Sequence, residues 1–348
     1  MGGDNYFGIL RPHTELVSTN AVDNTDEFVA GTLYDLGAVV KVSAENNLYK
    51  CLTKDTTEIP TGNKTTENWL FLGKTNPHKM FDEKYKSRTV KESGNLVVTK
   101  SRTVKVSRNL VVTKSRKDKE SGNLVVTIKM KEDGGFSKAS DGIALLNVSA
   151  SKIRIVGVRE GETIYDEEFD MGVLDLFSPC KIINCNFGQI VYKKNLILTP
   201  LKDKDGLIVY GCRSTEYTIT FVPIDVETPA ACGVCILGKM QYFGKTLMNP
   251  KKSLVNYDVK DTNEYGDTAV VERGFSNNYN FSFVGKNDIM QVADETLTEL
   301  RSTPLIYVVT DDQILASVFS GYGMVSILDI TQQGACDMLM TLEVGSLA

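Results

Sequence analysis

The chain has 348 residues, of which 42% are hydrophobic, and it carries a formal net charge of −5. This length predicts two or three domains with apolar cores of their own. The negative net charge argues against a dedicated nucleic-acid-binding protein. The lack of a long apolar run argues against insertion into a membrane.

Residues 1–25 are expected to form an N-terminal arm. Within it, the apolar stretch from Tyr6 to Leu10 is consistent with a short strand. Such a strand either packs within its own chain or is donated to the sheet of a neighbouring subunit. The sequence leaves both alternatives open.

Residues 26–75 are expected to form a small three-stranded β module. Fewer than about fifty residues bury little core, so aromatic residues and valines must supply most of it. Gly37 permits a tight turn into Val39 and Val40, and the pair Asn46-Asn47 suits a hairpin turn before Leu48.

The aromatic and glycine positions of this module follow a known pattern. They lie in three segments, Tyr34 to Val40, Leu48 to Cys51 and Trp69 to Gly73. The pattern resembles the short carbohydrate-binding module of chitinases and phage tail proteins. The resemblance implies that Tyr34, Tyr49 and Trp69 stack on sugar rings. The alternative is that these three rings are simply the core of the module, since a sugar-binding form usually has further exposed aromatics.

A fourteen-residue unit occurs three times in succession between residues 86 and 127. Each copy ends in the β-branched segment Leu-Val-Val-Thr after a Ser-Gly-Asn or Ser-Arg-Asn turn, so the units are expected to form β-hairpins. The near-identity of the copies indicates a duplication inserted where the parent fold needed one unit. An insertion of this kind is tolerated at an edge or in a loop.

The repeated segment also concentrates positive charge in an otherwise acidic chain. One hypothesis is an electrostatic interface with an acidic neighbour, such as another subunit or an anionic bacterial surface. The alternative is a solvated ribbon whose lysines prevent edge-to-edge aggregation. The candidate interface residues are Arg88, Lys91, Arg102, Lys105, Arg108, Arg116 and Lys117.

Residues 76–275, which include the repeats, are expected to form an antiparallel β-sandwich. Short apolar runs recur there, separated by Gly, Asn, Asp and Pro and without helical periodicity. The predicted strands are 143–146, 152–156, 196–198, 207–210, 217–222 and 235–237.

Residues 276–348 are expected to form a C-terminal α+β domain, so that the whole chain is mainly β. Asn287 or Asp288 begins a helix that places Ile289, Ala293, Leu297 and Leu300 on its apolar face and ends before Pro304. Strands on both sides complete a β-α-β unit. The predicted strands are 281–284, 305–309, 314–319, 323–330 and 338–344.

Several further segments resemble parts of tail proteins of tailed bacteriophages. They are residues 75–82, 144–147, 152–156, 162–166, 256–258, 264–267, 271–276 and 342–345. The resemblance implies a non-enzymatic structural protein of the virion, assembled in the host cytoplasm and repeated around the tail axis. Its implied partners are other copies of itself and the tube, adaptor or fibre proteins of the tail. The alternative is a receptor-binding tail protein whose partner is a host surface glycan.

Seven cysteines are scattered along the chain, which is typical of reduced and mostly buried thiols. The spacing of Cys232 and Cys235 raises a zinc hypothesis, but no second such pair exists. His13 and His78 are the only histidines, and neither belongs to a catalytic pattern. We therefore expect neither a metal nor a cofactor.

Acidic side chains are the only candidate catalytic residues in the sequence. Paired carboxylates perform glycoside hydrolysis, which a phage depolymerase would require. However, depolymerases are usually long repetitive β-helices, so we expect turns and subunit contacts instead, and no enzyme. A calcium loop at 258–266 does not have the required spacing. The two clusters are Asp166, Glu167, Glu168, Asp170 and Asp175, and Asp258, Asp261, Asn263 and Glu264.

Overall fold

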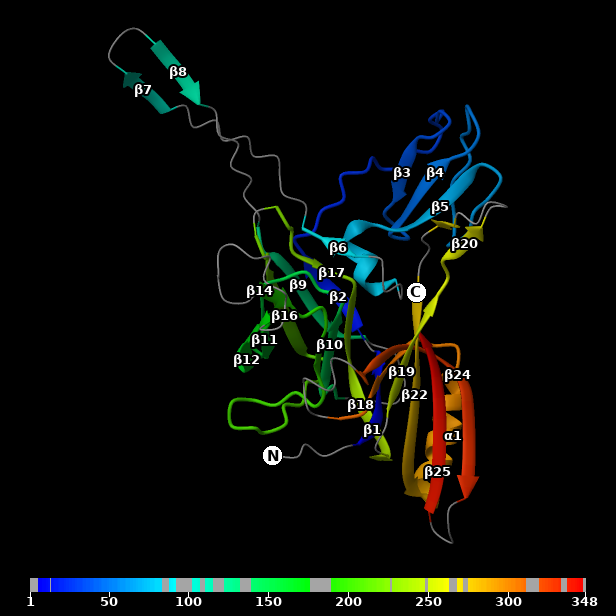
Figure 1. The fold of residues 1–348 in the computed structure, drawn as a ribbon. Coiled ribbons are helices and arrows are strands. Elements are labelled where there is room, and N and C mark those ends of the chain that lie inside the picture. Colours follow the sequence, from blue (N-terminus) through cyan, green and yellow to red (C-terminus); the bar gives the residue numbers. More distant parts are fainter. Residues whose placement is uncertain are drawn as a thin grey trace.

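The computed structural model describes most of the chain, and it is mainly β, as predicted (Figure 1). Its sheets are antiparallel, and one long helix lies near the C-terminus. No helix in the described part of the chain is long and apolar enough to span a bilayer. The described residues are 6–12, 14–82, 88–91, 102–106, 110–114, 122–131, 139–175, 189–225, 227–247, 250–262, 268–271, 275–310, 319–332 and 337–346.

The N-terminal module is a three-stranded antiparallel sheet, as predicted, and the 3-10 helix η1 (Asn76–Phe81) follows it. Asn46 has a positive φ of 56°, which places the expected hairpin turn between the first two strands. Its strands are β3 (Val39–Val42), β4 (Asn47–Cys51) and β5 (Trp69–Lys74).

The predicted β-sandwich is present at the centre of the molecule. A five-stranded sheet in the order β12-β11-β16-β9-β2 packs on β10, β15 and the first half of β18. Val126, Ile153 and Ile219 on the first sheet meet Ile143 and Leu237 on the second in one buried core. The strands are β2 (Thr14–Thr19), β9 (Leu124–Met130), β10 (Gly142–Leu146), β11 (Lys152–Arg159), β12 (Glu162–Asp170), β15 (Leu196–Leu198), β16 (Thr215–Val222) and β18 (Val234–Thr246).

The second half of β18 continues into a closed six-stranded barrel. Its strand order is β18-β1-β23-β24-β25-β22, and β18 pairs with β22 again at Lys245 and Thr246. β19 (Lys251–Asn256) extends the sheet beyond β22 as an edge strand. The other barrel strands are β1 (Phe7–Pro12), β22 (Phe275–Lys286), β23 (Leu305–Val308), β24 (Gly321–Gln332) and β25 (Asp337–Ser346).

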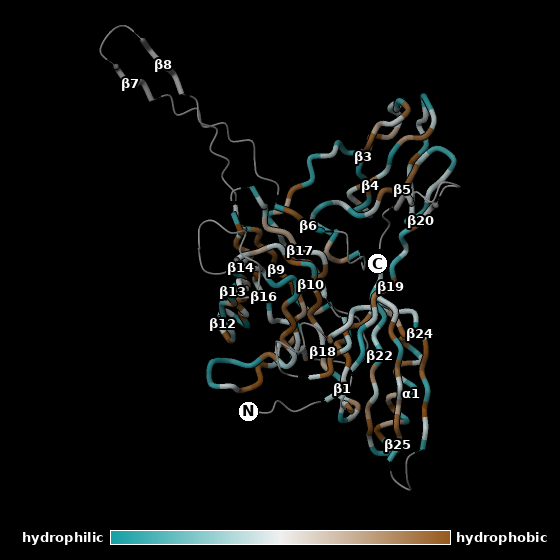
Figure 2. Tube along the Cα trace, viewed as in Figure 1, coloured by the Kyte–Doolittle hydropathy of each residue, from teal (hydrophilic) through white to brown (hydrophobic). Residues whose placement is uncertain are grey.

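Aromatic side chains fill the barrel. Phe7 stacks on Phe283 with 4.1 Å between ring centroids, and it also contacts Phe243, Phe281 and Tyr307. Along β22 and β25 buried positions alternate with more exposed ones, and Figure 2 shows the corresponding change between apolar and polar residues along these strands. The interior is therefore a packed core.

The helix α1 (Asn287–Glu299) packs on this aromatic core through Met290, Ala293 and Leu297. The predicted helix is present, but the expectation that Ile289 faces the core is wrong, because Ile289 is 41% exposed. The strand-helix-strand order is also present. However, β22 and β23 are separated in the sheet by β25 and β24, so the three elements are not a parallel crossover unit.

The N-terminal arm contributes strands to both sheets. β1 lies between β18 and β23 in the barrel, and β2 pairs with β9 in the sandwich. The apolar stretch from Tyr6 to Leu10 therefore packs within its own chain. The nine-stranded sheet also combines strands from both sides of the boundary expected at residue 275.

Besides the hairpin of the middle repeat copy, the described residues include three short strand pairs outside these layers. They are β6 (Thr89–Val90) with β17 (Ala231–Cys232), β13 (Gly172–Asp175) with β14 (Gln189–Tyr192), and β20 (Val259–Thr262) with β21 (Thr268–Val271). The strand predicted at 207–210 is wrong: this segment is a loop in which Leu207 and Tyr210 are at least half exposed. The strand predicted at 314–319 lies outside the described residues except for Phe319.

The repeated unit is used in three different ways. The first copy supplies β6, whose Thr89 is fully buried, and the third supplies the start of β9 in the sandwich. In the middle copy β7 (Arg102–Val106) and β8 (Leu110–Lys114) form a hairpin, as predicted. Among the described strands, β7 and β8 pair only with each other (Figure 1).

The two ends of the inserted residues lie close together on the sandwich. A Cβ atom on Gly122 would be 3.7 Å from the Lys91 side chain. The Lys91 ammonium group donates a hydrogen bond of 2.9 Å to the carbonyl oxygen of Asn20, and the Asn20 amide donates to the carbonyl oxygen of Asn123. Asn20 thus joins the first and third copies.

We expect deletion of residues 92–119 to leave the sandwich intact, because the product contains one complete unit joined to Ile128. The thermal midpoint should stay within about 3 °C of the parent, which corresponds to about 1 kcal/mol. Calorimetry on both proteins measures this shift. A deletion of 92–127 also removes the start of β9 and should unfold the sandwich; equal losses in both deletions would contradict the assignment.

Candidate functional site

The module aromatics expected to bind sugar form the core of the module instead. Tyr49 is 0% and Trp69 is 1% exposed, and both pack with Val40 and Cys51. Tyr34 is half-buried, and its ring meets Trp69 edge to face at 5.6 Å between centroids. A sugar has no access to the faces of Tyr49 and Trp69, which favours the alternative that the rings are the core of the module.

The polar atoms of the same rings are also engaged. The Trp69 indole N–H donates to the Glu58 carbonyl oxygen at 2.9 Å, and the Tyr34 hydroxyl accepts a hydrogen bond from the Val29 N–H. Asn47 is fully buried and its amide donates to the Tyr49 hydroxyl at 3.0 Å. These bonds fix loops to the small sheet, which is a structural role.

The outside of the module is unexpectedly apolar. Val29, Leu33, Leu36 and Ile59 are each more than half exposed, with values of 58, 64, 66 and 59%. Single exposed apolar residues are normal on protein surfaces, but several on one small module are typical of an interaction surface. The aromatic pattern of the sequence marks residues of the core. It does not predict that these four apolar residues are exposed.

The basic interface residues are only partly described. Lys91 is held by Asn20, and Arg88 has a buried Nε atom, so both are parts of the body of the protein. Arg102 and Lys105 lie on β7, where they pair with Lys114 and Val111. Arg108, Arg116 and Lys117 lie outside the described residues. The predicted electrostatic interface therefore remains a prediction for the middle and third copies.

The first acidic cluster forms ion pairs across two strands. Asp166 accepts two hydrogen bonds from Arg154, at 2.8 and 2.7 Å, and Glu168 accepts one from Lys152 at 2.7 Å. The hydrogen bond from the Arg154 guanidinium lowers the pKa of Asp166. Both pairs are exposed, so they contribute little to stability, and the lowered pKa of Asp166 is the opposite of what a catalytic acid requires.

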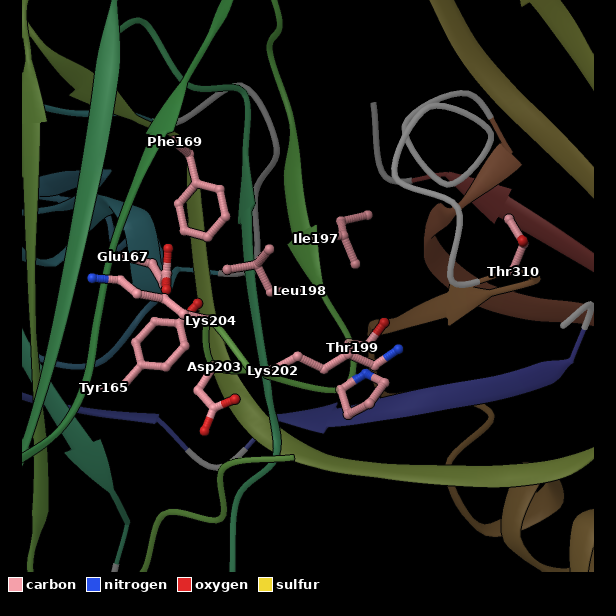
Figure 3. A pocket seen from close by; sticks show the side chains of 11 residues that line it. Tyr165, Glu167, Phe169, Ile197, Leu198, Thr199, Lys202, Asp203, Lys204 and Thr310 are labelled. Atoms are coloured by element: carbon pink, nitrogen blue, oxygen red, sulfur yellow. The ribbon is translucent and has the colours of Figure 1, made fainter. Parts of the chain in front are cut away.

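A cavity of about 330 Å³ lies beside this cluster, between the sandwich edges β12 and β15 (Figure 3). Tyr165 and Glu167 line it from β12, and Thr199 and Asp203 line it from the β15 side. Asp203 accepts hydrogen bonds from the backbone N–H groups of Asp205 and Leu207, so it shapes the loop. We assign no chemistry to this cavity.

The second acidic cluster lies at the start of the β20–β21 hairpin. Asp258 accepts a hydrogen bond from the Asn256 amide at 2.8 Å, and its own N–H donates to the Asn256 side-chain oxygen. Asp261 lies on β20, and the other two members of the cluster, Asn263 and Glu264, lie outside the described residues. In the described part of the chain no group of three or more His, Cys, Asp or Glu side chains is placed to hold a metal.

The described cysteines are free thiols, in two environments. Cys232 and Cys235 are buried, and burial raises the pKa of Cys232 to about 12. Both therefore behave as small apolar residues of the sandwich. Cys212 is partly exposed, and hydrogen bonds from Ser214 and Thr215 lower its pKa to about 7.

Two groups of exposed apolar side chains form an edge surface, which begins on β19 of the barrel sheet and continues to β20, and a helix surface on the barrel. The edge surface consists of Leu254 on β19, Tyr257 and Val259, with exposures of 63, 51 and 38%. The helix surface consists of Ile289 and Val292 on α1 and Ile330 on β24, with exposures of 41, 50 and 43%.

The helix surface has a defined shape. Ile289 and Val292 are three residues apart on α1, so they share one side of the helix. Ile330 lines a hollow of about 400 Å³ together with Asp288 and Gln291 of α1. Ile330 therefore joins the helix surface to this depression, whereas Ile289 and Val292 lie outside its lining. On the edge surface, Leu254 lies on β19, whose outer side is unpaired among the described strands.

Comparison with known proteins identifies no relative: no protein-family model matches the chain, and no curated protein is significantly similar to it. The function must therefore be inferred from the residues themselves.

Proposed function

We propose that this chain is a structural component of a bacteriophage tail that assembles with other copies of itself around the tail axis. A sheath protein, an adaptor-associated ring and a fibre-anchoring protein all fit this description. The resemblance of residues 26–75 and of the later segments to phage tail proteins supports the proposal. The observation that carries it is the presence of two unlike apolar surfaces on one barrel.

Two unlike surfaces favour one kind of assembly. A symmetric dimer buries the same surface of both subunits, whereas a head-to-tail contact joins two different surfaces and generates a closed ring or a helix. The edge surface exposes Leu254 on β19, and the helix surface offers the hollow beside Ile330. A protruding apolar side chain and a hollow whose wall includes Met290, Ile330 and Met338 are complementary in shape.

The edge strand also limits its own partners. Lys251 and Lys252 begin β19 and are exposed, so they discourage indiscriminate pairing with other strand edges. A neighbouring subunit that has carboxylates beside its hollow can form ion pairs with these lysines. Asp288 and Asp294 line the hollow on the helix surface. The charges of the two surfaces are therefore complementary as well.

The apolar side chains of the N-terminal module suit contacts with the other partners. Val29, Leu33, Leu36 and Ile59 are separate in sequence from both barrel surfaces. In the proposed assembly the barrel forms the ring, and the module reaches the tube, adaptor or fibre proteins.

The proposal is tested by two variants that each break one surface. Leu254→Asp breaks the edge surface and Val292→Asp breaks the helix surface. An unpaired charge buried in an apolar contact costs about 3 kcal/mol or more, so each variant alone should be monomeric with at least about 100-fold weaker association. An equimolar mixture should form one-to-one dimers, because each variant retains the surface that the other lacks.

Light scattering after size-exclusion chromatography measures both outcomes. Leu207→Asp is the matched control, since Leu207 is 66% exposed and lies outside both surfaces. It should assemble like the parent. Mixtures that stay monomeric, or single variants that assemble fully, would contradict the head-to-tail arrangement.

A further inference from the structure

A second cavity lies where the barrel meets the sandwich. It has a volume of about 270 Å³ and is lined from the barrel side by Lys252, Phe275 and Tyr279. Asn147 and Asn195 line it from the sandwich side, from the segments next to β10 and β15. It adjoins the cavity between β12 and β15, since Ile197 lines both, and it is separate from the aromatic core of the module.

Its aromatic wall is held rigidly. Tyr279 is 7% exposed, and its ring stacks on Phe281 with 5.9 Å between centroids and 14° between planes. Gly321 leaves room for this ring, because a Cβ atom there would lie 2.8 Å from it. Phe275 is 51% exposed, so one side of its ring is free to stack on a ligand.

The wall also contains a polar group that needs a partner. Ser320 is 8% exposed, and its buried hydroxyl makes no hydrogen bond among the described residues. A buried hydroxyl without a partner costs about 1 to 3 kcal/mol. A ligand hydroxyl in the cavity would provide the missing hydrogen bond.

Two asparagines and one lysine also line the cavity. Asn147 has a positive φ of 51°, and its backbone N–H donates to the Asn195 side-chain oxygen at 3.1 Å. Lys252 places its ammonium group 5.6 Å from the centre of the Tyr279 ring. The described lining residues include this one cation and no carboxylate. The cavity therefore favours an anionic ligand.

We propose that this cavity binds one pyranose ring that bears a carboxylate, as in an acidic unit of a polysaccharide. The apolar side of the sugar stacks on Phe275, and its hydroxyl groups bond to Ser320 and the two asparagines. The carboxylate lies near Lys252. A volume below the about 300 to 1,000 Å³ of drug-sized sites admits a single ring. Repeated copies around a ring would convert weak single-site binding into avidity.

The test is a titration of the full chain with four acidic methyl glycosides, observed by saturation-transfer difference NMR. These are the α- and β-glucuronides, a galacturonide and a sialoside, each compared with methyl glucoside. We expect at least one acidic sugar to bind about tenfold more tightly than the neutral one, since one charged hydrogen bond contributes about 1.5 kcal/mol or more.

Three variants locate the binding. Lys252→Ala should remove the preference for the acidic sugar, and Phe275→Ala should weaken all sugars about tenfold. Lys251→Ala is the matched control, because it removes the neighbouring lysine of the same strand, which does not line the cavity, and should leave sugar binding unchanged. Lys252 and Phe275 are exposed, so these variants retain the fold, which circular dichroism verifies.

Three results would overturn the proposal. They are no binding by any of the four acidic sugars, equal binding of the neutral glycoside, and binding unchanged by Phe275→Ala. These results measure sugar binding alone. Lys252 lies on the edge strand as well as in the cavity, so the assembly is tested separately at Leu254 and Val292, which do not line the cavity.

Discussion

Replacing Gly238 by alanine should strongly destabilise the native barrel. Gly238 lies in β18 at the point where this strand leaves the sandwich and enters the barrel, and it pairs with Gly142 on one side and Pro12 on the other. A Cβ atom at this position would overlap the backbone carbonyl oxygen of Arg11. Relief requires β1 to move away from β18, which opens the barrel.

We expect a loss of at least about 4 kcal/mol for Gly238→Ala, in the range of the most damaging single substitutions. Urea unfolding followed by circular dichroism measures it. Gly345→Ala in β25 is the matched control, because nothing lies within 4 Å of a Cβ atom at that glycine. It should change stability by less than about 1 kcal/mol. Equal midpoints for both variants would contradict the close approach of β1 and β18.

Phe7→Ala should lower the free energy of unfolding by about 3 to 5 kcal/mol, as expected for a large aromatic removed from a packed core. Phe7 is 0% exposed and its ring contacts four other aromatic rings inside the barrel. The cavity that remains is enclosed by strands on all sides, so it cannot collapse easily.

Phe275→Ala provides the control for this measurement. Phe275 begins β22 and is 51% exposed, so its removal should cost less than about 1 kcal/mol. Chemical unfolding of both variants gives the two values. A loss for Phe7→Ala no larger than that for Phe275→Ala would show that β1 is not part of the folded barrel.

Much of the secondary structure is predictable because buried strands alternate. β9 and β16 show a strict alternation of buried and half-buried or exposed residues, and the apolar residues that mark them are visible in the sequence. Where the alternation is missing, prediction fails. The run Leu207 to Tyr210 is as apolar as a strand, but Gly206 has a φ of 78° and begins an exposed loop.

The barrel could not be predicted from local patterns. Its closure depends on β1 pairing with β18 and β23, which are more than two hundred residues away in the chain. Hydrogen bonds between such distant strands leave no periodic signal. The buried face of the helix differs from the predicted one for a related reason. Ile289 and Met290 are both apolar, and only the position of the barrel decides which of them is buried.

The repeats show how sequence context selects among identical segments. All three copies contain Asn-Leu-Val-Val-Thr, but only the third continues into Ile128 and Met130. These two side chains are 0 and 2% exposed in the sandwich core. The first two copies continue into Lys-Ser, which cannot fill the same space. The third copy therefore forms β9.

The candidate sites were harder to predict than the fold. Tyr49 and Trp69 match a sugar-binding pattern, yet a module of this size needs large rings for its own core. Leu254 and Val292 are proposed to form subunit contacts, and Phe275 and Lys252 are proposed to bind a sugar. None of these four residues belongs to a recognisable sequence pattern. They differ from other surface residues in their exposure and in the neighbours that they have in space. Neither property can be predicted from the adjacent sequence.

The mass of the purified parent chain, measured by light scattering and accompanied by negative-stain electron microscopy, tests head-to-tail assembly most directly. We predict closed rings with a fixed number of copies. A monomer at every concentration examined, or a dimer that does not grow, would contradict the proposed role as a repeated structural component of a tail.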